Sequence, residues 1–217
     1  MDIDFALIVR SLPFLFRGLG MTLKLSVLTL LIGSIVGFIG GLCCLSKHKF
    51  AKVLANCYSD FFRGTPSIVQ LFVIYFAIPS ILNFDIEPFF ACLISFSLNT
   101  GAYVTEIVRG GIESIDKGQT EAGKCLGLSS SQIMWHIIFP QAIKRILPAL
   151  GNEFIATIKE TSIVGTIGLK ELTREGQLII ASTYATFEIW ATVALFYLVL
   201  IVVLTKILDF FERRLND

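Results

Sequence analysis

The chain alternates between long apolar intervals and short polar ones. Five of the apolar intervals are long enough to cross a bilayer, which takes about 20 residues of α-helix. They lie at about 21–45, 53–82, 88–108, 146–167 and 189–211. The pattern predicts an all-α integral membrane protein with five transmembrane helices. Composition agrees, because 54% of the 217 residues are hydrophobic and only 16% are charged.

Residues 1–18, before the first predicted span, have a different pattern. Charged residues such as Asp2 and Asp4 alternate there with apolar ones at helical spacing, at Phe5, Ile8, Leu12 and Leu15. This is typical of an amphipathic helix lying at the membrane interface. We expect it to form a segment separate from a transmembrane domain at 19–217.

Glycines mark one face of the first predicted span. Gly33, Gly37 and Gly41 are spaced by four residues. Small residues at this spacing let two helices approach closely in a membrane. The pattern fits packing inside the subunit or dimerisation, and it favours packing inside the subunit.

The second interval is longer than one span and is interrupted at Gly64-Thr65-Pro66. Proline lacks a backbone donor and breaks a helix. Irregular backbone at membrane depth is tolerated only where protein or a water-filled cavity surrounds it. If the break lines a solute pathway, Thr65 and Gln70 would face that pathway. Arg63, just before the break, would pair with Asp60 or contact a ligand.

Basic residues indicate which loops are cytoplasmic. The first loop holds Lys47, Lys49 and Lys52, and the C-terminus holds Arg213 and Arg214. Between the third and fourth spans lie Arg109, Lys117, Lys124, Lys144 and Arg145. The rule therefore predicts an N-terminus outside and a C-terminus inside.

The polar interval 117–140 is dense in local signals. Asp116 and Gln119 have the spacing of a capping box, so a short helix should begin near Lys117. Gly127 suits the left-handed residue that ends such a helix. Ser129 and Gln132 repeat the capping-box spacing and predict a second short helix. Pro140 is expected to end or kink that second helix.

The same interval resembles the EAA loop of ABC importer permeases. The residues that carry the resemblance are Glu121-Ala122-Gly123, Gly127, Ile137 and Pro140. Gly123 stands where the family usually has Ala, at a cost of up to about 1 kcal/mol in helix propensity, and Phe139 stands where Leu is usual. FRGTPSIVQLFVIY, LNTGAYVTEIVRGGI and LPALGNEFIATIKETS extend the resemblance to the polar amino acid (histidine, arginine and glutamine permease) branch.

The resemblance implies the transmembrane domain of a type I ABC importer, resident in the bacterial plasma (inner) membrane. The helix Glu121–Leu126 would sit in a cleft of a cytoplasmic ABC ATPase dimer, coupling through Glu121, Ala122, Gly123, Leu126 and Gly127. Other expected partners are a second permease copy, identical or paralogous, and an extracytoplasmic solute-binding protein. The chain itself would work by alternating access, with no cofactor and no catalytic residue, while a partner hydrolyses ATP.

Polar residues inside the predicted spans form the candidate solute site. The fourth span holds Asn152, Glu153, Lys159 and Glu160, which cannot face lipid unpaired. They would form a Glu–Lys network between helices, a polar wall of a solute cavity, or both. Asn99, Thr65 and Gln70 complete the candidate set. Two carboxylates favour a cationic amino acid such as arginine or lysine, since a desolvated cation needs a carboxylate.

Two other functions fit parts of the pattern. A gradient-driven secondary transporter would use Glu153 and Glu160 as an ion relay, although such transporters usually carry two related repeats, which this chain lacks. An assembly scaffold gives no reason for charges inside the fourth span.

Three kinds of site are not expected. Gly118–Lys124 satisfies G-x-x-x-x-G-K, but Cys125 follows it and no strand-like run precedes it, so it does not predict a phosphate loop. Two histidines without ligand spacing predict no metal site. A net charge of +1 gives no basic surface for nucleic acid.

Overall fold

The computed structural model describes residues 4–216, and every regular element in that range is helical. Asp2 and the last residue of the predicted 19–217 domain lie outside the described residues. The α-helices are α1 (Phe5–Cys44), α2 (Lys49–Gly64), α3 (Ser67–Phe72), α4 (Ile78–Leu82), α5 (Pro88–Glu113), α6 (Lys117–Cys125), α7 (Ser130–Ile133), α8 (Phe139–Glu160), α9 (Leu172–Thr183) and α10 (Thr186–Asn216). Two π turns (Val73–Ala77 and Met134–Ile138) and a 3₁₀ segment (Thr161–Ile167) connect some of them.

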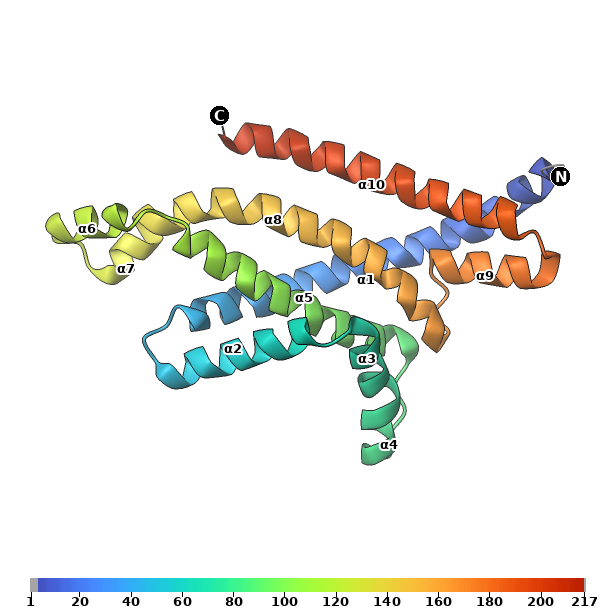
Figure 1. Cartoon of the computed structure of the whole chain (residues 1–217), viewed down its shortest axis with the longest axis horizontal. Helices are drawn as coiled ribbons and strands as arrows, with labels where there is room; N and C mark the ends of the chain where they lie inside the picture. Colours follow the sequence, from blue (N-terminus) through green and yellow to red (C-terminus); the bar gives the residue numbers. More distant parts are fainter. Residues whose placement is uncertain (1–3, 217) are drawn as a thin grey trace.

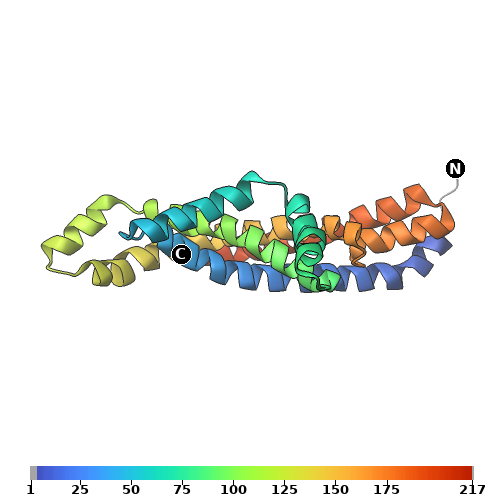
Figure 2. The ribbon, with the colours of Figure 1, turned by 90° about the horizontal axis from the view of Figure 1, so that it is seen from below.

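The molecule is elongated, and its long helices run roughly along one direction (Figure 1). At one end α6 and α7 project beyond the other helices, and the loop between α1 and α2 and the C-terminus also lie toward that end. The N-terminus and α9 lie at the opposite end, and the turned view keeps this separation (Figure 2). The predicted cytoplasmic segments therefore gather toward the same end of the molecule.

Three described helices are long and apolar enough to cross a membrane, namely α1, α5 and α10 over Thr186–Arg214. The α2 helix and the Ser67–Leu82 stretch pass the same test only together, as a pair bent by 104°. The predicted break at residues 64–66 is therefore confirmed. The predicted count of five spans is not reached by this criterion, in which α8 does not appear.

The glycine face of α1 packs against α5. A Cβ atom added to Gly37 would lie 2.4 Å from Val104 Cβ and 2.6 Å from the Gly101 carbonyl oxygen. Gly33 and Gly41 meet Thr100 and Val108 in the same way, at 2.9 and 2.6 Å. Only glycine permits this spacing, because real Cβ contacts do not approach so closely. The prediction of close packing inside the subunit is confirmed.

The expected boundary between residues 1–18 and the first span is absent. Helix α1 is continuous over 40 residues from Phe5 to Cys44, with Pro13 inside it. It begins where the Asp4 side chain accepts a hydrogen bond from the Leu7 N–H, at 2.9 Å. Its start is buried in part against α9 and α10, through Leu15 in a cluster with Leu172 and Ile189. Packing on these helices extends α1 where the amphipathic pattern alone predicted a separate segment.

The second short helix is interrupted just before Pro140. The chain passes from α7 through the π turn into α8, and Pro140 lies in the first turn of α8. In the wide π turn the Phe139 N–H reaches back to the Met134 carbonyl, and a proline at a helix start lacks only a donor that has no partner there. Helix α8 starts at Phe139, before the predicted span at about 146–167, and Pro148 lies inside it. The α-helix ends at Glu160, before the 3₁₀ segment.

Candidate functional site

The α6–α7 hairpin forms as the local signals predict. The Asp116 side chain accepts a hydrogen bond from the Gly118 N–H at 2.8 Å, so α6 begins at Lys117. Gly127 has φ +76°, the left-handed conformation expected after the helix. Ser129 and Gln132 form a reciprocal capping box at the start of α7, with bonds of 3.3 and 2.9 Å. These local bonds define the hairpin, and Ile133 also anchors it in a buried cluster with Val108 of α5 and Ile146 of α8.

Gly123 joins the two halves of the hairpin. It is buried, and a Cβ atom at this position would lie 2.8 Å from Ile133 Cγ1 and 3.3 Å from Ile137 Cδ1. The absence of a side chain therefore lets α6 lie directly on α7 and the π turn. The local sequence pattern predicts a loss of helix propensity at Gly123 but does not reveal this packing partner.

The opposite face of α6 is open. Glu121 and Ala122 are exposed, and Leu126 is 78% exposed. A leucine this exposed at a projecting tip is an apolar knob with no cover among the described residues. In Figure 1 this tip forms the extreme end of the molecule. Its size and chemistry fit insertion into an apolar groove of another chain.

At the break between α2 and α3, side-chain amides take the place of the missing backbone donors. The Gln70 side-chain nitrogen donates to the Phe62 carbonyl at 2.8 Å and lies within 3.0 Å of the Thr65 carbonyl and hydroxyl oxygens. Asn99 on α5 donates to the same Phe62 carbonyl at 3.2 Å and to the Gln70 side-chain oxygen at 2.9 Å. Asn99 thus finds both of its hydrogen-bond partners on other helices.

Two of the candidate solute residues are buried in this network. Gln70 and Asn99 are 5% and 4% exposed, so this conformation leaves neither side chain open to a solute. The Thr65 hydroxyl donates to the Phe61 carbonyl at 2.8 Å. All three side chains hold the shape of the break.

A cluster of charges lies on the other side of the break, at the inner part of α5. Arg63 forms an ion pair with Glu106 at 3.5 Å, so the expected pairing of Arg63 with Asp60 is wrong. Glu106 also accepts from the Ser59 hydroxyl at 3.1 Å and from the Arg109 Nε at 3.2 Å. Glu106 thus ties α2 to α5 next to the break.

Helix α8 carries the charged candidates. Glu153 and Glu160 are half-buried, whereas Asn152 and Lys159 are exposed. Within residues 4–214, no hydrogen bond or ion pair involves either carboxylate, so the expected Glu–Lys network is not formed in this conformation. The helix is fixed to α5 nearby, where the hydroxyls of Thr100 and Thr157 lie 3.3 Å apart.

Asn152 lies on the side of α8 next to α10. It lines a cavity of about 330 Å³ between α8 and α10, together with Pro148, Asp209 and Glu212. Gly151, the residue before it, packs against Leu208 of α10, since a Cβ there would lie 2.5 Å from a Leu208 methyl carbon. The structure therefore does not bring all six candidate solute residues together.

The structure also bears on the Gly118–Lys124 segment and on possible metal ligands. Residues Gly118–Lys124 lie inside α6 and follow the helix α5, so the strand that a phosphate loop requires is replaced by a helix. Among the described residues there is no group of three or more metal-ligating side chains.

Comparison with known proteins identifies the family. Residues 29–217 match the family of binding-protein-dependent transport system inner membrane components. This chain belongs to that family. It is therefore an inner-membrane transport component, as the motifs around Glu121 and Gly127 predicted.

Full-length relatives of this inner-membrane component are known. The chain is 43% identical to the glutamine transport system permease protein GlnP of Escherichia coli (strain K12), covering 100% of this chain and 99% of the relative. It is 41% identical, with the same coverage, to the arginine transport system permease protein ArtQ of Bacillus subtilis (strain 168).

Solved structures agree. The crystal structure of an amino acid ABC transporter with histidines contains a chain that superposes with a TM-score of 0.94 at 42% identity, covering 99% of this chain and 100% of that one. The inward-facing MetNI methionine ABC transporter gives a TM-score of 0.79 at 18% identity, covering 93% and 96%. The second likeness concerns the fold alone. The fold is that of a type I ABC importer permease.

Proposed function

We propose that this inner-membrane component is the permease subunit of an ABC importer for a polar amino acid, coupled to its ATPase through α6. The observation that carries the proposal is the projecting hairpin, with Leu126 78% exposed at its tip. GlnP and ArtQ, relatives over the whole chain, are named for the transport of glutamine and arginine. A separate motor is needed because Gly118–Lys124, a helical segment, lacks the context of a phosphate loop.

The proposed partners are those that the family resemblance implies. Two copies of the chain, identical or paralogous, would enclose the pathway, and a cytoplasmic ABC ATPase dimer would receive the two α6 helices through Glu121, Ala122, Gly123, Leu126 and Gly127. A solute-binding protein would deliver the amino acid from outside. The gathering of the α6–α7 hairpin, the α1–α2 loop and the C-terminus toward one end supports a topology with the C-terminus inside and the N-terminus outside (Figure 1). With α8 and the bent pair counted, this gives five spans.

The proposed mechanism is alternating access. ATP draws the two ATPase subunits together and moves the α6 helices with them. Helices α2 to α8 then change their angle about the break at Thr65-Pro66, which opens the pathway outward. Hydrolysis reverses the movement. Each ligand biases this equilibrium only by its differential affinity for the two conformations.

The solute would be held by polar side chains near the middle of α8. Glu153 and Glu160 are the two half-buried carboxylates that lack a partner in the described residues, which supports a cationic solute such as arginine or lysine. Asn152 contributes from its cavity beside α10. Thr65, Gln70 and Asn99 belong to the same proposed solute site. The Gln70 and Asn99 amides contribute by shaping the break, because they are not exposed to a solute in this conformation.

The test of coupling uses liposomes that hold this chain with its ATPase, with receptor outside and ATP inside. We expect ATP-dependent accumulation of one class of amino acid. Leu126→Ser should lower uptake about tenfold or more, the scale of an anchor residue in an interface, while the amount of inserted chain stays constant. Ile81→Ser is the matched control, because Ile81 is 76% exposed on α4, far from the hairpin. Uptake that ignores ATP and follows an imposed ion gradient would overturn the proposal.

Solute preference is tested separately. Glu153→Gln and Glu160→Gln should each weaken uptake of arginine relative to glutamine, by about 10- to 100-fold for the residue in contact, since a hydrogen bond to a charged group contributes about 1.5–3 kcal/mol. Lys159→Gln is the control in the same helix. If both Gln variants transport arginine normally, the cationic preference is wrong while the importer proposal stands.

A further inference from the structure

All the ion pairs among residues 4–214 belong to one cluster near the inner end of α5. Glu106 lies at its centre. One carboxylate oxygen of Glu106 accepts from the Ser59 hydroxyl at 3.1 Å, and the other contacts Arg63 at 3.5 Å and the Arg109 Nε at 3.2 Å. The Arg109 Nη1 donates in turn to Glu113 at 3.1 Å. Two arginines and two glutamates thus form a continuous chain of contacts from Arg63 to Glu113.

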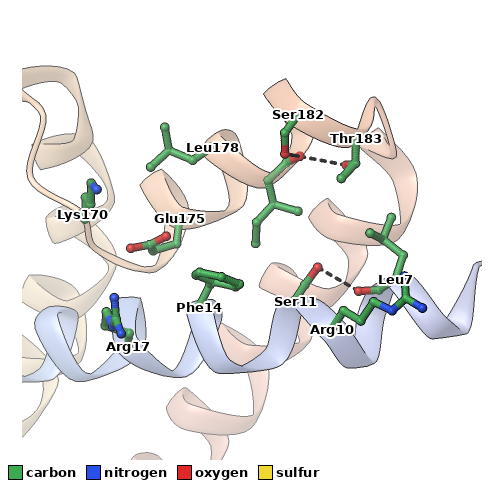
Figure 3. A pocket seen from close by; sticks show the side chains of 11 residues that line it. Leu7, Arg10, Ser11, Phe14, Arg17, Lys170, Glu175, Leu178, Ser182 and Thr183 are labelled. Carbon is green, nitrogen blue, oxygen red and sulfur yellow. Dashed lines mark hydrogen bonds between the residues drawn. The ribbon is translucent and has the colours of Figure 1, made fainter.

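The outer end of the subunit has charged side chains without such pairing. Arg17, Lys170 and Glu175 line a cavity of about 400 Å³ beside α1 and α9 (Figure 3). No ion pair joins any of these three to another of the described residues. The helices meet there through backbone, because a Cβ atom on Gly18 would lie 2.8 Å from the Leu172 Cα. Ion pairing is therefore concentrated at the end of the subunit that carries the hairpin.

The Glu113 end of the chain of ion pairs adjoins the hairpin. Glu113 is the last residue of α5, and Asp116, the N-cap of α6, follows three residues later. Ile112 of α5 and Ile133 of α7 belong to one buried apolar cluster. Separating these side chains would expose apolar surface to water, which is unfavourable. A movement of the hairpin therefore carries the inner end of α5 with it.

The Arg63 end of the chain of ion pairs lies beside the break, in the last turn of α2. Among the described residues, the three clusters of buried apolar side chains include none from α2. Polar contacts hold this helix on α5: Ser59 and Arg63 contact Glu106, and the Tyr58 hydroxyl donates to the Leu98 carbonyl at 2.6 Å. Changing a polar contact leaves no cavity of the kind that separated apolar side chains leave. Helix α2 can therefore change its angle to α5 more easily than the hairpin can leave α5.

Glu106 does not become an unpaired charge when Arg63 moves away. Arg109 stays on the same carboxylate, three residues further along α5. Arg63 has a second partner as well, because its guanidinium lies 5.8 Å from the centre of the Tyr103 ring, a cation–π contact. An uncompensated buried charge would oppose the opening of this contact. With these alternative partners, the contact between Arg63 and Glu106 can open and close.

We propose that Glu106 and Arg109 are positioning residues of the transport cycle, which transmit movement of the α6–α7 hairpin through Arg63 to the break at Thr65-Pro66. The inference rests on the proposed coupling of α6 to an ATPase, and it names the route by which that movement reaches the pathway. Coupling of this kind needs an element with two arrangements that both sites bias. The angle between α2 and α5 is that element.

The test measures ATP hydrolysis and amino acid uptake in the same liposomes, which hold this chain with its ATPase, receptor outside and ATP inside. Arg63→Gln and Glu106→Gln should each leave hydrolysis near the parent rate and lower uptake about tenfold, the scale of one hydrogen bond to a charged group. The number of ATP molecules hydrolysed for each amino acid imported should rise by the same factor. Residues that only stabilise the fold would lower both rates together.

Three further variants test the chain of contacts itself. The double variant Arg63→Gln, Glu106→Gln should lower uptake no further than Glu106→Gln alone, because both substitutions remove the same contact. Arg63→Lys should transport like the parent, since a contact of 3.5 Å depends on the charge and not on a planar fork. Arg109→Lys should behave like Arg109→Gln, because different nitrogens of the Arg109 guanidinium bond two carboxylates.

Asp60→Asn is the matched control. Asp60 is an exposed carboxylate on α2, one turn before Arg63, and it belongs to no ion pair in residues 4–214. Its substitution should change neither hydrolysis nor uptake. A thermal unfolding curve for each variant shows whether the fold is retained.

Three results would overturn the inference and leave the importer function intact. The first is parent-like uptake by Arg63→Gln and Glu106→Gln. The second is a parallel loss of hydrolysis and uptake in these variants, which would assign the residues to the stability of the fold. The third is an additive loss in the double variant. Absence of ATP-dependent uptake by the parent chain is a different result, because it would refute the proposed function itself.

Discussion

Gly37 of α1 lies so close to Val104 of α5 that a single added methyl group would come within 2.4 Å of the valine Cβ. The Gly101 carbonyl oxygen is 2.6 Å from the same point, so the obstacle includes backbone and cannot rotate away. This contact fixes how closely the two helices with the most extensive mutual packing can lie.

Gly37→Ala should therefore lower the free energy of unfolding in mixed micelles by about 1–3 kcal/mol, the usual cost of overpacking. Gly20→Ala in the same helix is the control, because nothing lies within 4 Å of the added atom. Its helix propensity gain is up to about 1 kcal/mol. Equal effects of the two substitutions would contradict the close contact.

At Gly123, alanine should loosen the hairpin even though it favours helix. The added methyl group meets Ile133 Cγ1 at 2.8 Å, which outweighs a propensity gain of up to about 1 kcal/mol. We expect faster amide hydrogen exchange in α6 for Gly123→Ala. In an Ile133→Ala background the same substitution should slow exchange, because the obstacle is gone. If Gly123→Ala changes the exchange rate of α6 in the same direction in both backgrounds, Ile133 does not decide the effect.

The amides at the break form a coupled pair. Gln70→Ala and Asn99→Ala should each lower the free energy of unfolding by about 1–3 kcal/mol. Each substitution removes a buried hydrogen bond from the Phe62 carbonyl or from the partner amide. The double variant should lose clearly less unfolding free energy than the two single variants added together. A double-mutant cycle measures the difference. Additive losses would show that the two side chains act separately.

The Glu171 carboxyl should make the stability of the fold depend on pH. Burial raises the pKa of this carboxyl above its ordinary value, against the opposing effect of the Thr173 and Arg174 N–H bonds and the Tyr197 hydroxyl. A raised pKa means that the folded chain holds the proton more tightly. The resulting stability is fully present below the unfolded value of about 4.3 and is lost as pH rises through the folded value.

The melting temperature of the parent chain should thus fall over this window more steeply than that of Glu171→Gln, whose side chain does not titrate. Melting can be followed by thiol labelling of the buried Cys92. Parallel curves for the two proteins would remove Glu171 as the source of the pH dependence. Lys159→Gln serves as a control for substitutions elsewhere in the chain.

The sequence was sufficient wherever a few neighbouring residues decide the structure. The capping box of Ser129 and Gln132 and the left-handed Gly127 are local, and the structure has both. The glycines of α1 were predictable for a related reason, because their spacing alone selects one face of a helix.

Long-range contacts decided the features that the sequence did not reveal. Arg63 has Asp60 one turn away, yet it pairs with Glu106 on another helix. The fourth span was predicted to begin near residue 146, but the π turn Met134–Ile138 leads into α8, which already begins at Phe139. Gly123 has a packing partner in Ile133 that no local pattern specifies. In the candidate solute site, burial of Gln70 and Asn99 likewise depends on the angle between α2, α3 and α5.

The interlocked glycines of α1 have a mechanical consequence. A register slip of one helical turn between α1 and α5 would bring larger side chains onto backbone, so sliding is blocked and the two helices can only translate and rotate together. An internal rearrangement of the subunit then has to take place where the regular helices are interrupted, such as the 104° corner between Gly64 and Ser67 and the π turn Met134–Ile138. These two interruptions adjoin the break and the α6–α7 hairpin.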